Sequence, residues 1–277
     1  MLKKISLIFS FCFCFLLSNG CNRIEENENQ KIREANAKGE YIHRKQGEFN
    51  YKLEEPKQKE REKYPWEDTL IGNQLKITKE YFRCKGGAHN PILAEGSLQR
   101  TDCAGAQHHS LPLRNGKEFV YPILTELLNY IQEKTGKKVV ITCGHRCPTH
   151  NSYADSTLHG RTSKHMIGAE VDFYVKGMEW VPERVVNVIM QYYKDQSAYK
   201  GKKEFEEFKR LEGEKLLSTA PWINKEVVVR LFKSNEGRDF DNQHPYPYLS
   251  LQVAYDRDLK EKVIYSWPKA FNGYLRY

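Results

Sequence analysis

The chain has 277 residues, of which 39% are hydrophobic and 29% charged, and its formal net charge is +8 at neutral pH. This length suffices for one domain of ordinary size beside an N-terminal extension. The chain contains no basic helix, no RNP motif and no aromatic stripe interleaved with basic residues, which argues against a nucleic-acid-binding protein.

The N-terminus has the composition of an export signal. Lys3 and Lys4 precede a largely apolar run from Ile5 to Leu17, which is too short to span a bilayer but typical of a signal peptide. The run ends in Leu17-Ser18-Asn19-Gly20-Cys21, which resembles a bacterial lipobox. We expect residues 1–21 to be a lipoprotein-type signal peptide and Cys21 to be lipidated. The alternative is an ordinary secretory signal that is cleaved nearby.

Residues 22–68 are polar and carry charges of both signs. Such a segment buries too little apolar surface to offset the entropy of ordering, so we expect it to be a tether. Residues 69–277 then form a single domain. Without the signal peptide the net charge is +6, because only Lys3 and Lys4 are removed. This moderate positive charge favours acidic polymers as partners.

Regular apolar patterns follow along the domain. Residues 121–131 have helical spacing, with Pro122 near the start and Gly136 beyond the end, and residues 138–143 have the composition of a strand. A second amphipathic helix is expected within residues 179–193. Further strands are expected at residues 171–175, 227–232 and 248–255. Since helices and strands do not alternate strictly, these patterns predict an α+β fold with a mainly antiparallel sheet and helices on one face.

The strand at residues 171–175 carries the first candidate site. Val171, Phe173 and Val175 share one face, so Asp172 points the other way, and His165 precedes it by seven residues. Imidazole nitrogen and carboxylate oxygen are preferred zinc ligands, and a catalytic zinc needs three protein ligands plus an open position for water. Taken alone, the pair also fits a hydrogen-bonded polar pair without metal.

Two further elements support a metal site. Asp241-Asn242-Gln243-His244 offers a second imidazole, with a carboxylate three residues before it that can stand beside a metal-bound water. Asp239 competes for this acid role, although the spacing to His244 favours Asp241. Arg146 follows a predicted strand, where a fixed cation can bind a substrate carboxylate or a developing oxyanion.

Together these segments resemble the zinc D,D-peptidase family, which trims peptidoglycan peptides. Ser163, His165, Gly168 and Asp172 match the Ser-x-His-x-x-Gly-x-Ala-x-Asp motif of that family, apart from its Ala. Cys143-Gly144-His145-Arg146-Cys147 is similar to its upstream Ser-Gly-Tyr-Arg-Ser element. The resemblance covers roughly residues 81–255 and is dense only between residues 139 and 175.

The resemblance implies a D,D-peptidase/hedgehog-like fold and one zinc ion per chain, bound by His165, Asp172 and His244. Asp241 would be the general base and Arg146 the clamp for the substrate or the transition state. Apart from the resemblance, we expect Ser163 to orient a zinc ligand through a hydrogen bond. We expect His159 to support a ligand or to bind substrate, and it is the reserve ligand should His244 fail. The expected protein is a zinc metallopeptidase of peptidoglycan stem peptides, anchored by lipid in the periplasm or at the outer membrane.

The chain also departs from the family pattern. Glu170 stands where the family usually has Ala, Cys143 and Cys147 replace serines, and residues 194–222 have the appearance of an insertion. The carboxypeptidase branch carries Glu at the acid position, whereas Asp is typical of the branch that cleaves between L-Ala and D-Glu. D,D-carboxypeptidase and endopeptidase activity therefore both remain open.

Four cysteines remain once the signal peptide is removed and Cys21 is lipidated: Cys84, Cys103, Cys143 and Cys147. An even number in an oxidising compartment predicts disulfides, with three possible pairings. A structural zinc site made of all four cysteines is the rival, although the spacings lack paired CxxC motifs. His108 and His109 are expected to be surface or substrate-lining residues, because adjacent histidines rarely bind one ion.

A different class of function also fits the chain. A lipoprotein that keeps the fold without catalysis could bind cell wall or a host ligand through the same exported domain. The acid at Asp241 favours the enzyme, because a purely structural zinc needs no free carboxylate beside it.

Overall fold

The computed structural model describes residues 30, 31, 34, 69–87, 90–155, 157, 160–212 and 217–277. The predicted signal peptide with Cys21, nearly all of the predicted tether, and His159 lie outside the described residues. The chain divides into two units, Met1–Glu62 and Lys63–Tyr277, and the second contains the sheet and all the candidate sites. Among the helices of the described residues, none is long and apolar enough to cross a membrane.

The described part of the second unit contains five α-helices and five short 3₁₀-helices. The α-helices are α2 (Pro122–Thr135), α3 (Pro148–Ala154), α4 (Pro182–Asp195), α5 (Lys203–Glu206) and α6 (Trp267–Asn272). The 3₁₀-helices are η1 (Lys79–Phe82), η2 (Ala106–His108), η3 (Gly160–Thr162), η4 (Lys164–Ile167) and η5 (Phe240–Asn242).

A six-stranded antiparallel sheet forms the centre of this unit, in the order β7-β8-β12-β11-β10-β9. Its strands are β7 (Val139–Cys143), β8 (Glu170–Val175), β9 (Lys209–Arg210), β10 (Trp222–Ile223), β11 (Val227–Phe232) and β12 (Tyr248–Val253). Four two-stranded hairpins surround it: β1 (Leu70–Ile71) with β2 (Gln74–Leu75), β3 (Leu93–Glu95) with β4 (Leu98–Arg100), β5 (Leu113–Arg114) with β6 (Lys117–Glu118), and β13 (Tyr255–Asp256) with β14 (Glu261–Lys262).

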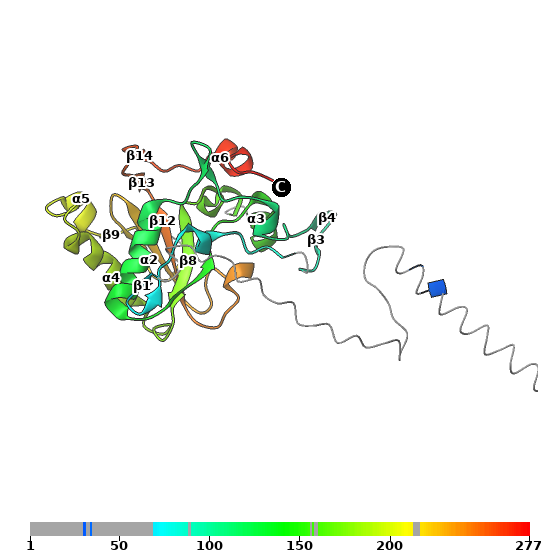
Figure 1. Cartoon of the computed structure of the whole chain (residues 1–277). Coiled ribbons are helices and arrows are strands. Elements are labelled where there is room, and N and C mark those ends of the chain that lie inside the picture. Colours follow the sequence, from blue (N-terminus) through cyan, green and yellow to red (C-terminus); the bar gives the residue numbers. More distant parts are fainter. Residues whose placement is uncertain are drawn as a thin grey trace, which may run out of the picture. The chain divides into compact units, whose positions relative to one another are not determined.

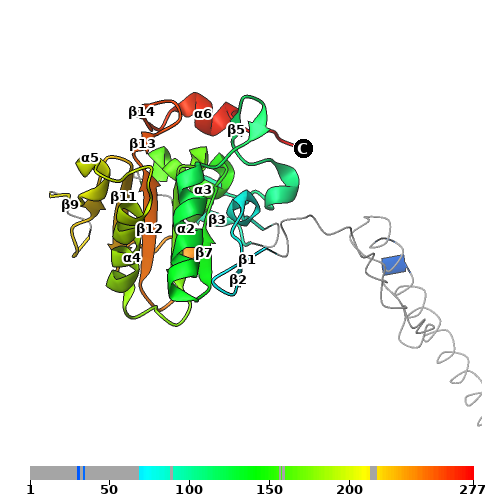
Figure 2. The same ribbon diagram turned by 60° about the vertical axis from the view of Figure 1, so that its left-hand side comes forward.

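Helices α2 and α4 lie side by side over one face of the sheet (Figure 2). Helix α2 starts at Pro122 and ends at Gly136, whose left-handed φ of 64° closes the last turn. The apolar stripes of both helices pack onto the strand residues that point the same way, among them Val171, Phe173 and Val175. These residues are almost fully buried, so the hydrophobic effect fixes which face of each strand turns inward.

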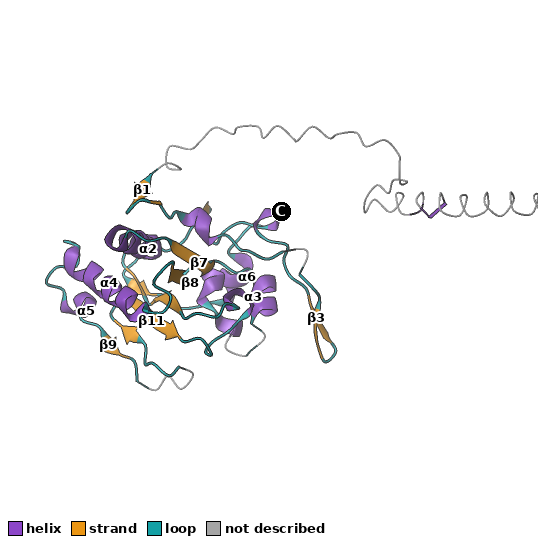
Figure 3. Ribbon diagram, turned by 90° about the horizontal axis from the view of Figure 1, so that it is seen from below, coloured by secondary structure: helices purple, strands orange, loops and turns teal. Residues whose placement is uncertain are grey.

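The opposite face of the sheet carries polar side chains in register. Across the four neighbouring strands from β7 to β11, Cys143 of β7 lies opposite Asp172, Asp172 opposite Ser250 of β12, and Ser250 opposite Arg230 of β11. A bulge at the end of β7 makes Cys143, and not Thr142, the partner of Asp172. We call these four residues the polar row. Views from the front and from below show the helical layer on one side of the strands (Figures 1 and 3).

The predicted fold class is confirmed: the protein is α+β, with an antiparallel sheet and several helices. Two details differ from the sequence patterns. The strand expected at residues 248–255 ends at Val253, because the next two amides turn to the carbonyl of Glu226, and Tyr255 begins a separate hairpin. Val188, expected in the buried stripe of α4, is only partly buried. Residues 194–222, expected to be an insertion, supply α5, the edge strand β9 and the first residue of β10, which pairs with β9 and β11.

Candidate active site

A cavity of about 680 Å³ lies over the polar face of the sheet. Strand residues of β8, β11 and β12 form part of its lining, including Asp172, Ser250 and Arg230. Loop residues supply the rest, among them His165 and Asp239. The cavity therefore brings together side chains that are far apart in sequence, over a rigid sheet.

His165 is held firmly at one end of this cavity. It lies in η4, where the Ser163 hydroxyl accepts a hydrogen bond from the His165 amide at 3.3 Å, and Gly168 closes the turn with a φ of 67°. The His165 ring bonds through Nδ1 to the Gly144 carbonyl at 2.8 Å. A carbonyl can only accept, so Nδ1 carries the proton and Nε2 is left with its lone pair.

The lone pair of His165 faces a carboxylate. Nε2 lies 3.4 Å from Oδ2 of Asp172, and both side chains are buried. Two ligand atoms at about 2.0–2.2 Å from a tetrahedral zinc ion would lie about 3.4 Å apart. Cys143 completes a group of three possible ligands whose donor atoms all lie within 4.8 Å of one another. The donor types and the spacing of this group fit a zinc ion.

Glu170, the residue that departs from the family motif, also faces the cavity. Its carboxylate accepts hydrogen bonds from Ser250 at 2.9 Å and from Gln252 at 3.2 Å, and it lies 4.0 Å from both Arg230 and His165 Nε2. The Glu170 oxygens thus contact side chains of β12 and β11. It adds negative charge beside His165.

Arg146 joins the sheet to the loop that bears the two candidate acids. Its side chain is 2% exposed. Its Nε donates to Asp241 at 2.6 Å, and its terminal nitrogen donates to Asp239. One buried cation is therefore shared by two carboxylates, so a substrate group would meet a cation that is already paired.

The two acids differ in what else they contact. Asp239 lines the cavity together with Arg146, His165 and Asp172, whereas Asp241 does not. Asp241 lies 3.0 Å from Nε2 of His150 on its other side. Burial alone raises the pKa of a carboxyl, and the pKa of Asp239 is raised for this reason. For Asp241 the hydrogen bond from His150 and the charge of Arg146 outweigh burial, so its pKa is lowered.

His244, the expected third ligand, is not grouped with His165 and Asp172. It belongs neither to their group of ligand atoms nor to the cavity lining. Its ring stacks on Tyr246 at 4.4 Å, and its Nδ1 donates to the Tyr246 carbonyl at 3.0 Å. Nε2 of His244 is buried and makes no hydrogen bond to any described residue.

Asn242 is a site residue that the sequence patterns did not single out. Its amide nitrogen donates to Oδ2 of Asp172 at 3.0 Å and to Asp239 at 2.6 Å, and its amide oxygen accepts from Thr142 at 2.7 Å. It fixes the orientation of the proposed ligand Asp172. The only signal was its position inside the Asp-Asn-Gln-His segment.

The predicted disulfides are absent, because all four cysteines of the described domain are free thiols. The sulfur atoms of Cys84 and Cys103 lie 3.5 Å apart, well beyond the length of about 2.05 Å of a disulfide bond. Cys143 lies elsewhere, beside His165. The four thiols therefore do not form the two pairs that an even number suggested.

Comparison with known proteins agrees with this geometry over part of the chain. No curated protein and no solved structure matches the sequence. A family model described as Peptidase M15 matches residues 99–207. The match includes Arg146, His165 and Asp172, ends before Asp239 and His244, and extends into the segment expected to be an insertion. Residues 99–207 are thus similar to the Peptidase M15 family, which suggests a peptidase.

Proposed function

We propose that this protein is a zinc-dependent peptidase that hydrolyses the stem peptides of peptidoglycan. The family match indicates a peptidase, and the observation that carries the metal assignment is the pair formed by His165 Nε2 and Asp172 Oδ2, 3.4 Å apart at the cavity. The peptidoglycan substrate follows from the resemblance of the motifs. The same resemblance, with the lipobox-like Cys21, supports an exported lipoprotein that reaches the cell wall from a membrane anchor.

His165 and Asp172 are the proposed zinc ligands, and His244 remains the proposed third ligand. Its Nδ1 donates to a carbonyl, so Nε2 carries a lone pair that no described residue uses. Zinc would supply a Lewis acid and lower the pKa of its bound water towards neutrality. Asn242 and Gly144 would hold the two ligands in place through their hydrogen bonds to Asp172 and His165.

For the acid-base role the geometry favours Asp239 over Asp241. Asp239 lines the cavity, and its raised pKa suits a group that accepts and returns a proton. Asp241, with its lowered pKa, remains ionised and holds Arg146 and His150. Arg146 lines the cavity beside Asp239 and is the proposed group that binds a terminal carboxylate or a developing negative charge.

Purified stem peptides, with mass-spectrometric analysis of the products, test this proposal. The wild-type protein should release either D-Ala or a product of internal cleavage, and it should lose this activity on chelation and regain it with zinc. His165→Ala should abolish turnover, whereas His108→Ala, at an exposed histidine outside the cavity, should leave it unchanged. Undiminished turnover by His165→Ala would overturn the assignment.

One observation favours a second candidate, a lipoprotein that binds cell wall without cleaving it. Among the described residues, the group around His165 and Asp172 is completed by Cys143 and not by a second histidine. A thiolate also binds zinc, but this ligand set differs from the two histidines and one aspartate that the resemblance implies for a catalytic site. Retention of stem peptides on the immobilised protein, with no product after prolonged incubation in zinc, would support this candidate over the peptidase.

A further inference from the structure

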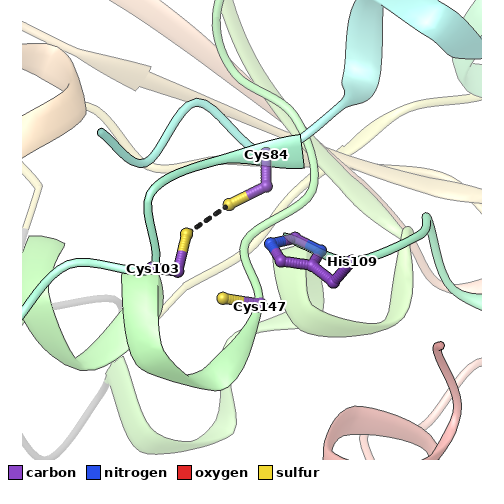
Figure 4. Close-up of side chains that lie close together, drawn as sticks. All are labelled: Cys84, Cys103, His109 and Cys147. Carbon is purple, nitrogen blue, oxygen red and sulfur yellow. Dashed lines mark hydrogen bonds between the residues drawn. The ribbon is translucent and has the colours of Figure 1, made fainter. Parts of the chain in front are cut away.

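We infer that Cys84, Cys103, Cys147 and His109 form a second zinc site, separate from the cavity and structural in role. This inference does not rest on the peptidase proposal. One ligand atom of each of the four residues lies within 4.8 Å of the other three. Figure 4 shows the three sulfur atoms and one ring nitrogen of His109 directed towards a common centre. Three thiolates and one imidazole are an established ligand set for structural zinc.

The distances agree with a shared ion. Zinc–sulfur bonds of about 2.3 Å in a tetrahedral arrangement place two sulfurs about 3.8 Å apart. The sulfur atoms of Cys84 and Cys103 are 3.5 Å apart. Cys84, Cys147 and His109 are buried, and Cys103 is half-buried, so the centre is closed to solvent in the manner of a structural site.

His109 supplies the clearest sign that a ligand is expected. Its Nδ1 bonds to the Ser110 carbonyl at 3.1 Å, so the proton resides on Nδ1 and Nε2 carries the lone pair. This Nε2 is buried and has no hydrogen-bond partner among the described residues. His145 and Tyr274 pack edge-on against the ring at 5.6 and 5.5 Å and fix its direction. A buried, unpaired acceptor is costly unless it binds something.

Each sulfur has a nitrogen neighbour of its own. The Gly105 amide donates to Cys103 at 3.3 Å, and the His150 amide donates to Cys147 at 3.4 Å. Cys84 lies 3.0 Å from the ring nitrogen Nδ1 of His150. The two amide hydrogen bonds stabilise thiolates and orient metal ligands. The surroundings of Cys103 and Cys147 therefore suit metal-bound thiolates.

Two other arrangements, a disulfide between two of the thiols and a metal site that includes Asp102 and His150, explain fewer of these contacts. Three clustered thiols can form one disulfide and then leave one buried thiol over, because Cys143 lies at the cavity beside His165. Asp102 and His150 also approach Cys103. The oxygens of Asp102, however, are taken by the amides of Gly87 and Cys103, and Nε2 of His150 is taken by Asp241. His145 beside it also has ring nitrogens without a partner, but among the described residues only His109 places such a nitrogen in the group with the three thiols.

The four ligands come from three segments of the chain. Cys84 follows η1, Cys103 and His109 flank η2, and Cys147 is the residue before α3. A zinc ion would tie these segments together next to Arg146. Through Cys84 and His150 it would also support Asp241, which lies 3.0 Å from the far side of the His150 ring. A fold with few regular elements in this region would gain most from such a cross-link.

Cobalt substitution tests the inference, because thiolate ligands give a charge-transfer band that His and Asp ligands cannot. The full exported chain carrying His165→Ala should still bind one metal ion and show the thiolate band and tetrahedral visible bands. Adding Cys103→Ser should abolish both. Adding Cys143→Ser instead is the matched control and should preserve them. Failure of the peptidase proposal would alter the zinc content and turnover of the wild type, but not these bands.

Two outcomes would overturn the inference: absence of the thiolate band from His165→Ala, or peptide mapping of the unreduced protein showing that Cys84 is joined to Cys103 or Cys147. If Cys103→Ser does not fold, His109→Ala provides a second test, since three thiolates remain. Its metal affinity should fall by at least the roughly tenfold that even outer partners of a zinc site contribute. Unchanged affinity in His109→Ala would remove His109 from the site.

Discussion

The clearest test of the site compares Asp239→Asn with Asp241→Asn, since both substitutions keep the shape of the side chain and remove its charge. Both residues contact the buried Arg146, but only Asp239 lines the cavity. We expect Asp239→Asn to lower kcat by about 10²–10⁴-fold, the usual contribution of a general acid-base group. We expect Asp241→Asn to lower stability instead.

The size of the stability loss follows from the contacts. Asp241 is 9% exposed, holds Arg146 at 2.6 Å and lies 3.0 Å from His150. Breaking a buried ion pair costs about 3–5 kcal/mol when the remaining charge is left alone. In Asp241→Asn, Asp239 still neutralises Arg146, so we expect the free energy of unfolding to fall by about 3 kcal/mol, the lower end of this range. That loss corresponds to a fall in Tm of about 6–12 °C for a domain of this size.

The two substitutions should also change the pH dependence of stability in opposite ways. The folded-state pKa of Asp241 is lowered, so this residue contributes stability above its unfolded pKa of about 4 and loses it as pH falls through the folded value. Wild type and Asp241→Asn should thus differ in stability at neutral pH and converge in acid. The folded-state pKa of Asp239 is raised, so its charge costs stability at neutral pH. Asp239→Asn should therefore melt no lower than the wild type there.

Turnover of stem peptides, thermal melting from acid to neutral pH and zinc content, measured on the same preparations, decide between the two acids. An inactive Asp241→Asn that melts like the wild type, beside an active Asp239→Asn, would refute the reasoning. The acid role would then return to Asp241, where the sequence pattern first put it.

Three further substitutions probe the fold and the anchor. Phe173→Ala, at a fully buried position under the helices, should lower the free energy of unfolding by about 3–5 kcal/mol in urea titration; a loss below 1 kcal/mol would contradict the packing described. Gly144→Ala should cost about 1–3 kcal/mol or more by thermal melting, because its new Cβ would lie 2.6 Å from the Cα of Phe82, and an unchanged melt would show that this contact yields easily. Cys21→Ser should abolish incorporation of labelled palmitate, whereas persistent labelling would exclude the lipid anchor at this residue.

The sequence was sufficient to predict the elements whose pattern is local. The apolar spacing of α2 and α4, the proline at each start and the alternation in β8 all follow from the way a helix or a half-buried strand meets a core. The alternation also put Asp172 on the face away from the core. These features depend on residues that are close in sequence, so a single sequence is enough to predict them.

What depended on register and long-range contact could not be predicted. The bulge in β7 shifts the partner of Asp172 from Thr142 to Cys143, and the residue pattern of β7 does not predict this shift. The spacing between Asp241 and His244 suggested one shared site, but it gave no sign that Asp241 contacts Arg146 and His150. The cysteine count suggested pairs, whereas the fold brings three of the four together with a histidine.

The cavity has a floor and a rim of different character. Its floor consists of strand residues such as Asp172 and Ser250, whose strands are paired on both sides and whose reverse face is the hydrophobic core. Its rim consists of loop residues such as Thr162, Leu217 and Arg238, outside the sheet. Substitutions at the rim can therefore change which peptide is accepted without moving the metal-binding groups. A library of variants with substitutions only at the rim would be the most direct way to select a new peptide specificity for this domain.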